Sequence, residues 1–220
     1  MAVADKRVFL ADLTAVLKAH WPQNRTVTIA CHGHSVPSGY FATPMVDTFH
    51  AYPHLLHRAL KNRFPFAVVN VVVTAIGGEN SESGARRFRD DVLAFRPDVV
   101  TIDYGLNDRG PGLEKARAAW TAMIHEARER GSRVILLTPT PDIGETPEAL
   151  GSGNAVRDHA AQIRRLAEEH GTGLVDSLAL FERHAAAGGE IADLMSWRNH
   201  PNGRGHELVA RELTGWFPPA

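Results

Sequence analysis

Five short apolar runs alternate along the chain with longer segments whose apolar residues recur every three or four positions. The runs are rich in Val and Ile and lie at residues 26–31, 67–73, 99–103, 133–138 and 173–176. Short, nearly continuous apolar runs of this kind are typical of parallel strands that are covered on both faces. The sequence therefore predicts five strands of a parallel β-sheet.

The segments between the runs have the spacing of amphipathic helices. The clearest stripe comprises Leu113, Ala116, Trp120, Met123 and Ala127. Further stripes predict helices near residues 7–20, 51–63, 85–95, 156–167 and 209–216. Because strand–helix–strand units place helices on both faces of a parallel sheet, we expect a three-layer α/β/α sandwich. No repeat or linker divides the 220 residues, so residues 1–220 are expected to form one domain, with residues 1–25 as an N-terminal helical extension.

Composition narrows the range of partners. Lys and Arg number 24 and Asp and Glu 25, and a net charge of −1 argues against a basic face for nucleic acid and against a polybasic membrane anchor. No apolar run approaches the roughly 20 residues of a membrane span. Charges interrupt the N-terminal apolar residues, so the chain as written predicts a cytoplasmic protein, although a trimmed signal peptide would leave no trace in it. The oligomeric state does not follow from the sequence.

In a parallel α/β sheet, ligands bind beyond the carboxyl ends of the strands. The first predicted strand runs into a turn at Gly33, and Ser35 follows just past the strand end. A serine there could attack a substrate, with its own backbone N–H directed at the developing charge. The alternative is that Gly-X-Ser is only a turn.

Three further loops carry candidate groups. Gly77-Gly78 after the second strand could form an anion-binding nest or a tight turn, and Asn107 after the third could provide an amide donor or form a turn. His200, which precedes a proline and the last helix, has a side chain with an ordinary pKa near 6.5 and could act as a general base. His206 falls inside that helix and is expected to be structural or solvent-facing.

The order of these blocks resembles that of the SGNH (GDSL-type) hydrolase family. The chain has Gly-X-Ser at the first strand, Gly at the second, Gly-X-Asn-Asp at the third and His-Pro-Asn-X-X-Gly-His near the end, a likeness that runs from about residue 26 to 216. The resemblance implies a flavodoxin-like fold and a serine esterase that forms an acyl-enzyme and needs no metal or organic cofactor. It makes Ser35 the nucleophile and His200 the base. The implied oxyanion hole consists of the backbone N–H groups of Ser35 and Gly78 and the side chain of Asn107.

Two positions depart from the family pattern. His34 stands where the family usually has Asp, and Trp197 stands where an Asp usually precedes the histidine by three residues. We expect Ser35 and His200 to form a dyad in which a backbone carbonyl orients the imidazole. The alternative is that Asp193 or Asp176 supplies the third triad member.

The remaining candidate groups have plainer interpretations. His32 and His34 could chelate a metal, as could His50, His54 and His57 on one helix face, but neither set has a complete ligand pattern and we expect no metal site. Cys31, the only cysteine, excludes an internal disulfide and is expected to be a buried strand residue. Arg109 and Glu79 lie beside the proposed oxyanion donors and could contact the substrate.

The expected substrate is a small-molecule or glycan ester. No apolar lid segment is evident, which favours short acyl groups and a carbohydrate acetyl esterase. A lysophospholipase or thioesterase is the alternative within the same chemistry, and a catalytically inactive glycan-binding module is the alternative from another class.

Overall fold

A twisted parallel sheet of five strands forms the centre of the molecule. The computed structural model describes residues 2–146, 148 and 153–218. The strands are β1 (Thr26–Gly33), β2 (Val68–Val73), β3 (Val99–Asp103), β4 (Arg133–Leu137) and β5 (Gly173–Val175), in the order β2-β1-β3-β4-β5. The five predicted strands are confirmed, and their boundaries differ from the predicted ones by at most two residues.

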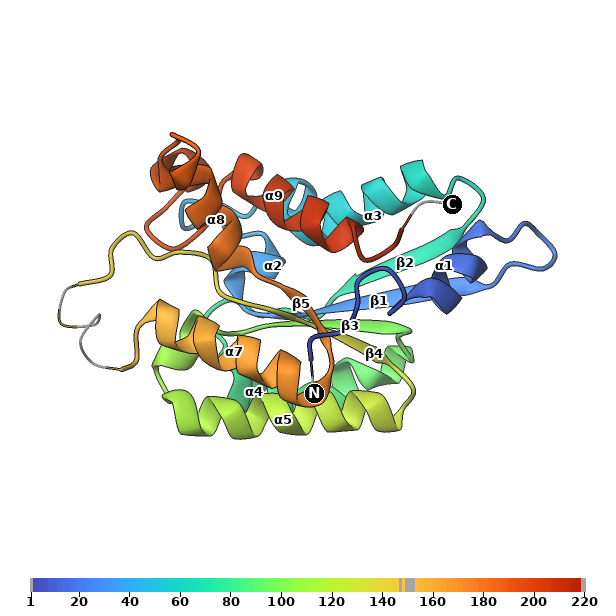
Figure 1. Ribbon diagram of the computed structural model, residues 1–220, viewed down its shortest axis with the longest axis horizontal. Coiled ribbons are helices and arrows are strands. Elements are labelled where there is room, and N and C mark those ends of the chain that lie inside the picture. Colours follow the sequence, from blue (N-terminus) through green and yellow to red (C-terminus); the bar gives the residue numbers. More distant parts are fainter. Residues whose placement is uncertain (1, 147, 149–152, 219–220) are drawn as a thin grey trace.

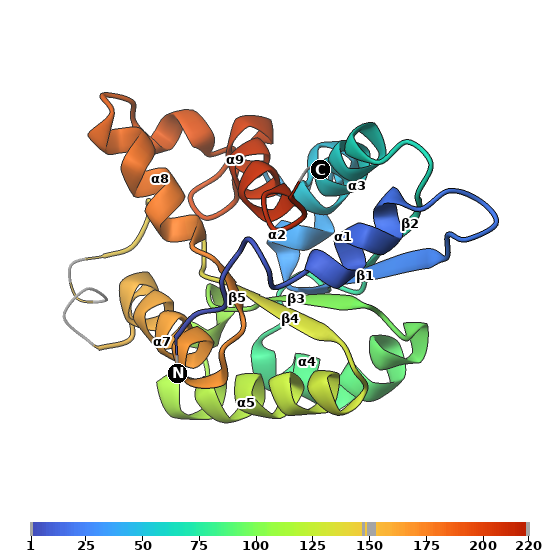
Figure 2. The same ribbon diagram turned by 45° about the vertical axis from the view of Figure 1, so that its right-hand side comes forward.

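Helices cover both faces of this sheet (Figure 1). One layer contains α1 (Ala11–Lys18), α3 (Tyr52–Arg63), α8 (Ser177–Ala186) and α9 (Gly203–Thr214). The opposite layer contains α4 (Ser81–Asp91), α5 (Leu113–Glu129) and α7 (Val156–His170). The predicted three-layer α/β/α sandwich is therefore confirmed. Figure 2 shows α1 and α3 toward the β2 edge of their layer and α8 on the other side.

Side chains of the central strands alternate between two cores. Ile29 and Cys31 of β1 face the core beneath α1, α3 and α9, whereas Ala30 faces the core beneath α4, α5 and α7. The second core contains Phe88, Trp120 and other residues that are buried completely or almost completely. Both faces of the central strands β1 and β3 are therefore largely buried, which explains their continuous apolar runs in the sequence.

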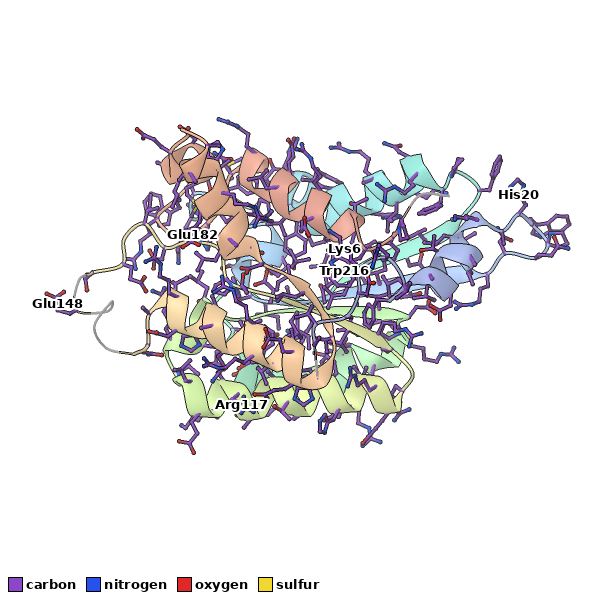
Figure 3. The ribbon with its side chains drawn as sticks, viewed as in Figure 1. Lys6, His20, Arg117, Glu148, Glu182 and Trp216 are labelled. Carbon is purple, nitrogen blue, oxygen red and sulfur yellow. The ribbon has the colours of Figure 1, made fainter. Side chains whose placement is uncertain are left out.

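The N-terminal segment packs against the C-terminal helix. Leu13 and Leu17 of α1 belong to the same core as α9. Lys6 Nζ donates a hydrogen bond of 2.6 Å to Glu212 and lies 6.0 Å from the ring centroid of Trp216 (Figure 3). None of the helices in the described part of the chain is both long and apolar enough to cross a membrane.

The topology brings the ends of β1 and β3 together. The chain passes from β1 to β2 on one side and then returns to place β3 on the other side of β1. Register pairs Ile29 with Val99 and Gly33 with Asp103. The loops after β1 and β3 therefore leave the carboxyl edge side by side, at the point where strand order reverses and where such sheets bind ligands.

Among the described residues, two helices were not anticipated from the sequence. The four-residue α2 (Ser35–Ser38) begins immediately after β1, and α8 buries only Ser177, Leu178 and Phe181, which is too short a stripe to stand out. Single helical turns also occur at η1 (Thr48–His50), η2 (Leu93–Phe95), η3 (Asn107–Arg109) and η4 (Ile191–Leu194).

Candidate active site

Ser35 and His200 are hydrogen-bonded to each other, although 165 positions separate them in the sequence. The distance between Ser35 Oγ and His200 Nε2 is 2.9 Å. Both residues are buried, with 7% of each residue exposed. This length and burial are suitable for proton transfer from a serine hydroxyl to an imidazole.

The turn between β1 and α2 places Ser35 at the sheet edge. A Cβ at Gly33 would lie 2.4 Å from the backbone oxygen of Asp103 and 2.8 Å from Pro37 Cγ, so only glycine fits this crossing of the two chains. The His34 side chain caps α2, because its Nδ1 accepts the Val36 N–H at 3.2 Å. Ser35 is thus the first residue of α2. The backbone before it is fixed by the close contact of Gly33 with Asp103, and the backbone after it by the hydrogen bond from Val36 N–H to His34.

The loop that carries His200 is folded back on itself. Met195 and Pro201 form an isolated antiparallel bridge, and the backbone N–H groups of Ser196 and Trp197 both donate to the His200 carbonyl. These contacts place the imidazole directly before α9.

A backbone carbonyl orients the imidazole of His200. Its Nδ1 lies 2.8 Å from the Phe41 oxygen, which can only accept, so Nδ1 carries the proton and Nε2 is free to receive the Ser35 proton. The Phe41 ring stacks on His206 at 5.2 Å, and His206 Nδ1 accepts the backbone N–H of Tyr52 at 3.2 Å. Burial lowers the pKa of His200, although the hydrogen bond to Phe41 partly opposes that shift. The imidazole is therefore neutral at pH 7.

Neither candidate acid contacts His200. Asp176 caps α8, accepts the Thr138 hydroxyl and forms an ion pair with Arg164. Asp193 accepts the Glu190 N–H at 3.2 Å and lies 3.7 Å from His184 Nε2. These two carboxylates serve local structure, so the described contacts do not support the alternative in which one of them orients His200; the partner of its Nδ1 is the expected backbone carbonyl.

The three candidate oxyanion donors have N–H groups available. Asn107 Nδ2 donates to the Glu79 oxygen at 2.9 Å, which fixes the amide and leaves its second N–H without an acceptor in the described structure. Within the described residues, the backbone N–H groups of Ser35 and Gly78 donate to no protein acceptor. Gly78 has a φ of +81°, a left-handed conformation that favours glycine. Tyr40 Cε2 would lie only 2.9 Å from a Cβ at the neighbouring Gly77, so this ring packs against Gly77, whereas a Cβ at Gly78 would meet nothing within 4 Å.

Asp108 connects the loops that carry Gly78 and Asn107, a role that sequence reasoning missed. Its completely buried carboxylate accepts the Ser81 N–H at 2.8 Å and the Trp120 Nε1–H at 2.6 Å. Burial raises the pKa of Asp108 despite these hydrogen bonds. The signal was present in the Gly-X-Asn-Asp block, whose final Asp had been given no function.

Glu79 and Arg109 both form ion pairs with other side chains. Glu79 accepts the Tyr104 hydroxyl at 2.7 Å and pairs with Arg87. Burial raises the pKa of Glu79, but hydrogen bonds from Arg87 and Tyr104 outweigh it and hold the pKa below its usual value. Arg109 pairs with Asp142 at 2.8 Å and also contacts Glu145. Both side chains are thus held by ion pairs, and contact of either with a substrate stays a prediction.

The other histidines have structural contacts. His32 contacts Thr74 Oγ1 at 3.0 Å, and burial lowers its pKa to about 4. His50 pairs with Asp47 on η1 and does not continue the helix of His54 and His57. Within the described ranges, no three His, Cys, Asp or Glu side chains gather as a metal site would require. Cys31 is buried in β1 as expected, and burial raises the pKa of its thiol to about 12.

Comparisons with known proteins agree with this architecture. The family model described as "GDSL-like Lipase/Acylhydrolase family" matches residues 31–208. An acetylxylan esterase from Geobacillus stearothermophilus is 25% identical over 161 residues, which cover 67% of this chain and 72% of that relative.

Solved structures extend the likeness to the fold. The crystal structure of an acetylxylan esterase from Geobacillus stearothermophilus has a TM-score of 0.72 at 22% identity and covers 88% of this chain and 95% of that one. A mutant described as an acetyl-xylooligosaccharide esterase from the same organism has a TM-score of 0.74 at 22% identity, over 92% of this chain and 97% of that one.

Proposed function

Because the chain belongs to the GDSL-like lipase/acylhydrolase family and is thus an ester-bond hydrolase, we propose that it removes acetyl groups from carbohydrate esters, with Ser35 as nucleophile. The observation that carries this proposal is the 2.9 Å hydrogen bond between Ser35 Oγ and the neutral, carbonyl-oriented imidazole of His200.

The proposed reaction proceeds through an acyl-enzyme. Ser35 Oγ attacks the ester carbonyl while His200 Nε2 takes the hydroxyl proton. The N–H groups of Ser35, Gly78 and Asn107 stabilise the oxygen of the tetrahedral intermediate. The intermediate collapses when the C–O bond to the sugar breaks and His200 returns its proton to the leaving oxygen. Water, deprotonated by His200, then releases acetate and restores the serine.

The preference for a short acyl group rests on the packing beside Ser35 and on the relatives. Tyr40 packs against Gly77, and its ring centroid lies 6.1 Å from that of His200. A large ring beside both Gly77 and His200 is expected to restrict the space for a long acyl chain. The matched relative is an acetylxylan esterase, whose acyl group is the shortest common one.

The first test compares wild type with Ser35→Ala on p-nitrophenyl acetate, p-nitrophenyl octanoate and an acetylated xylooligosaccharide. Wild type should hydrolyse the acetates faster than the octanoate, and Ser35→Ala should lose several orders of magnitude in kcat. An organophosphonate should label wild type at Ser35. Equal activity of the two proteins, or a label on another residue, would overturn the assignment of Ser35, and faster octanoate turnover would overturn the short-acyl preference.

A second test concerns the oxyanion donors. Asn107→Ala should reduce kcat by about 10²–10³-fold, because one such donor contributes about 2.7–4 kcal/mol to transition-state stabilisation. Asn70→Ala, at an exposed asparagine of the edge strand β2, is the matched control and should leave kcat unchanged. Similar kcat values for the two variants would exclude Asn107 as a donor.

A further inference from the structure

A buried histidine and a buried aspartate lie directly behind the nucleophile. The side chains of His34 and Asp103 are 1% and 5% exposed, and His34 Nε2 lies 3.5 Å from Asp103 Oδ1. They come from neighbouring strands, because Gly33 pairs with Asp103 in the sheet and the His34 N–H donates to the Asp103 backbone oxygen at 3.2 Å. Of the described carboxylates, Asp103 is the only one in contact with His34.

The hydrogen bonds of His34 determine which ring nitrogen carries the proton. Nδ1 accepts the Val36 N–H at 3.2 Å, so that nitrogen has no proton of its own. A neutral ring must then carry its proton on Nε2, which is buried, has no hydrogen-bond partner among the described residues and lies 3.5 Å from the Asp103 carboxylate. A carboxylate oxygen at this distance favours an N–H over a lone pair on the facing nitrogen, and therefore favours this tautomer over the alternative.

The tautomer of His34 matters because the same Nδ1 lies 3.4 Å from Ser35 Oγ. A proton on Nδ1 would oppose the Val36 N–H and would bond to the Oγ lone pairs that have to attack the ester carbonyl. With Nδ1 unprotonated and its lone pair occupied by Val36, the Ser35 hydroxyl is left to donate to His200 at 2.9 Å. The imidazole of His34 therefore lies against Ser35 Oγ but does not take the hydroxyl hydrogen bond away from His200.

We propose that His34 and Asp103 form a positioning pair: Asp103 holds His34 in the Nε2–H tautomer, and His34 in turn holds the start of α2 and the Ser35 side chain in line with His200. This inference rests on the proposed function, since it assigns the pair to the reaction of Ser35. In this site the Phe41 carbonyl, and not a carboxylate, orients His200. The buried carboxylate of Asp103 instead contacts His34, on the side of Ser35 away from His200. His34 is not the base, because its lone pair is occupied and it lies farther from Oγ than His200 does.

The test compares variants that keep an acceptor with variants that remove it. Asp103→Asn and His34→Asn each retain an oxygen that can accept the relevant N–H, whereas Asp103→Leu and His34→Leu retain bulk alone. We expect kcat on p-nitrophenyl acetate to fall by about 10²-fold in the two leucine variants, because a misplaced nucleophile loses alignment. The two asparagine variants should stay within roughly tenfold of wild type, since each keeps an oxygen that can face the N–H concerned. KM should not change in any of them, because the pair does not contact substrate.

A double variant tests whether Asp103 acts through His34. In the His34→Asn background no imidazole remains to be held in one tautomer, so adding Asp103→Leu should lower kcat far less than it does in wild type. Full additivity of the two losses would overturn the proposed coupling.

His159→Leu is the matched control for removing a buried imidazole. His159 on α7 is as buried as His34, with 1% exposed, and its ring bonds to Asn154 and not to the candidate site. The His159→Leu variant should be less stable than wild type but should keep its kcat. The rate at which an organophosphonate labels Ser35 should fall in His34→Leu and Asp103→Leu and should not fall in His159→Leu. If His34→Leu and Asp103→Leu lose no more kcat than His159→Leu, the positioning role fails while the function of Ser35 stands. If wild type is inert or Ser35→Ala remains active, the proposed function itself fails, and this inference with it.

Discussion

The imidazole of His200 is oriented by the Phe41 oxygen, where many serine hydrolases use a carboxylate. A carbonyl fixes the tautomer as a carboxylate would, but it carries only a partial charge and therefore stabilises the imidazolium of the transition state less. Burial acts in the same direction, since it disfavours the charged ring. His200 should consequently be a base that stays neutral to unusually low pH.

The pH dependence of kcat/KM tests that property of His200. Burial lowers the pKa of the ring below its ordinary value near 6.5, and only the unprotonated ring can accept the Ser35 proton. The rate should therefore rise with pH through a midpoint below 6.5 and should be close to its plateau at pH 7. A midpoint above 6.5 would contradict this account. Full recovery of activity on return to pH 7 separates titration of His200 from acid unfolding.

At the scale of elements, the site depends on how closely β1 and β3 approach at their carboxyl ends. The Gly33 and Asp103 backbones pack so tightly that a single methyl group cannot be added without a shift of one strand end. The same close approach brings Asp103 to His34 and starts α2 at Ser35. The packing of the strand ends and the placement of Ser35, the proposed nucleophile, therefore depend on the same contact.

Gly33→Ala should reduce both stability and activity. The added Cβ would lie 2.4 Å from a backbone oxygen, and overpacking of this kind costs roughly 1–3 kcal/mol. Gly203→Ala is the control, because a Cβ at this first residue of α9 meets nothing within 4 Å. Urea denaturation should show a lower midpoint for Gly33→Ala alone, together with a lower kcat. Equal midpoints for the two variants would show that the strand ends relax without cost.

At the scale of the whole molecule, the fold buries several histidines in neutral form. Burial lowers the pKa of His32 and of His159 to about 4 and that of His206 to about 3. These rings lie on β1, α7 and α9, so both layers of helices contain one. Unfolding exposes them to water, where each recovers a pKa near 6.5.

The molecule should therefore become less stable as pH falls below 6.5. Between pH 6.5 and pH 4 the unfolded chain binds more protons at these rings than the folded chain, so the free energy of unfolding decreases as pH falls. Each ring should contribute a loss on the order of 2 kcal/mol between pH 7 and pH 5. Chemical denaturation at the two pH values measures the loss, and His206→Asn should make it smaller. An unfolding free energy that is the same at pH 5 and pH 7 would refute the prediction.

Much of the architecture could be predicted from the sequence because it depends on local patterns. The runs at 26–31 and 99–103 are apolar on both faces because β1 and β3 have helices on both sides. The apolar stripe of α5 recurs every three or four residues because one face of this helix is buried. The helix α8 escaped prediction because three buried residues do not make a recognisable period. The candidate site residues could be named because each lies in a short motif next to a predicted element, and the order of these motifs resembles that of the SGNH hydrolase family. They are Ser35, Gly78, Asn107 and His200.

The sequence by itself thus determined the layers, the strands and which side chains to examine at the carboxyl edge. The tertiary structure alone decided how those side chains are oriented. The Phe41 oxygen belongs to the backbone and has no signature in the residue pattern, and the pairing of His34 with Asp103 depends on the register of two strands that are distant in sequence. The engagement of Glu79, Arg109, Asp176 and Asp193 in local contacts follows for the same reason: hydrogen bonds and ion pairs depend on distances of a few ångströms, which only the packed molecule specifies.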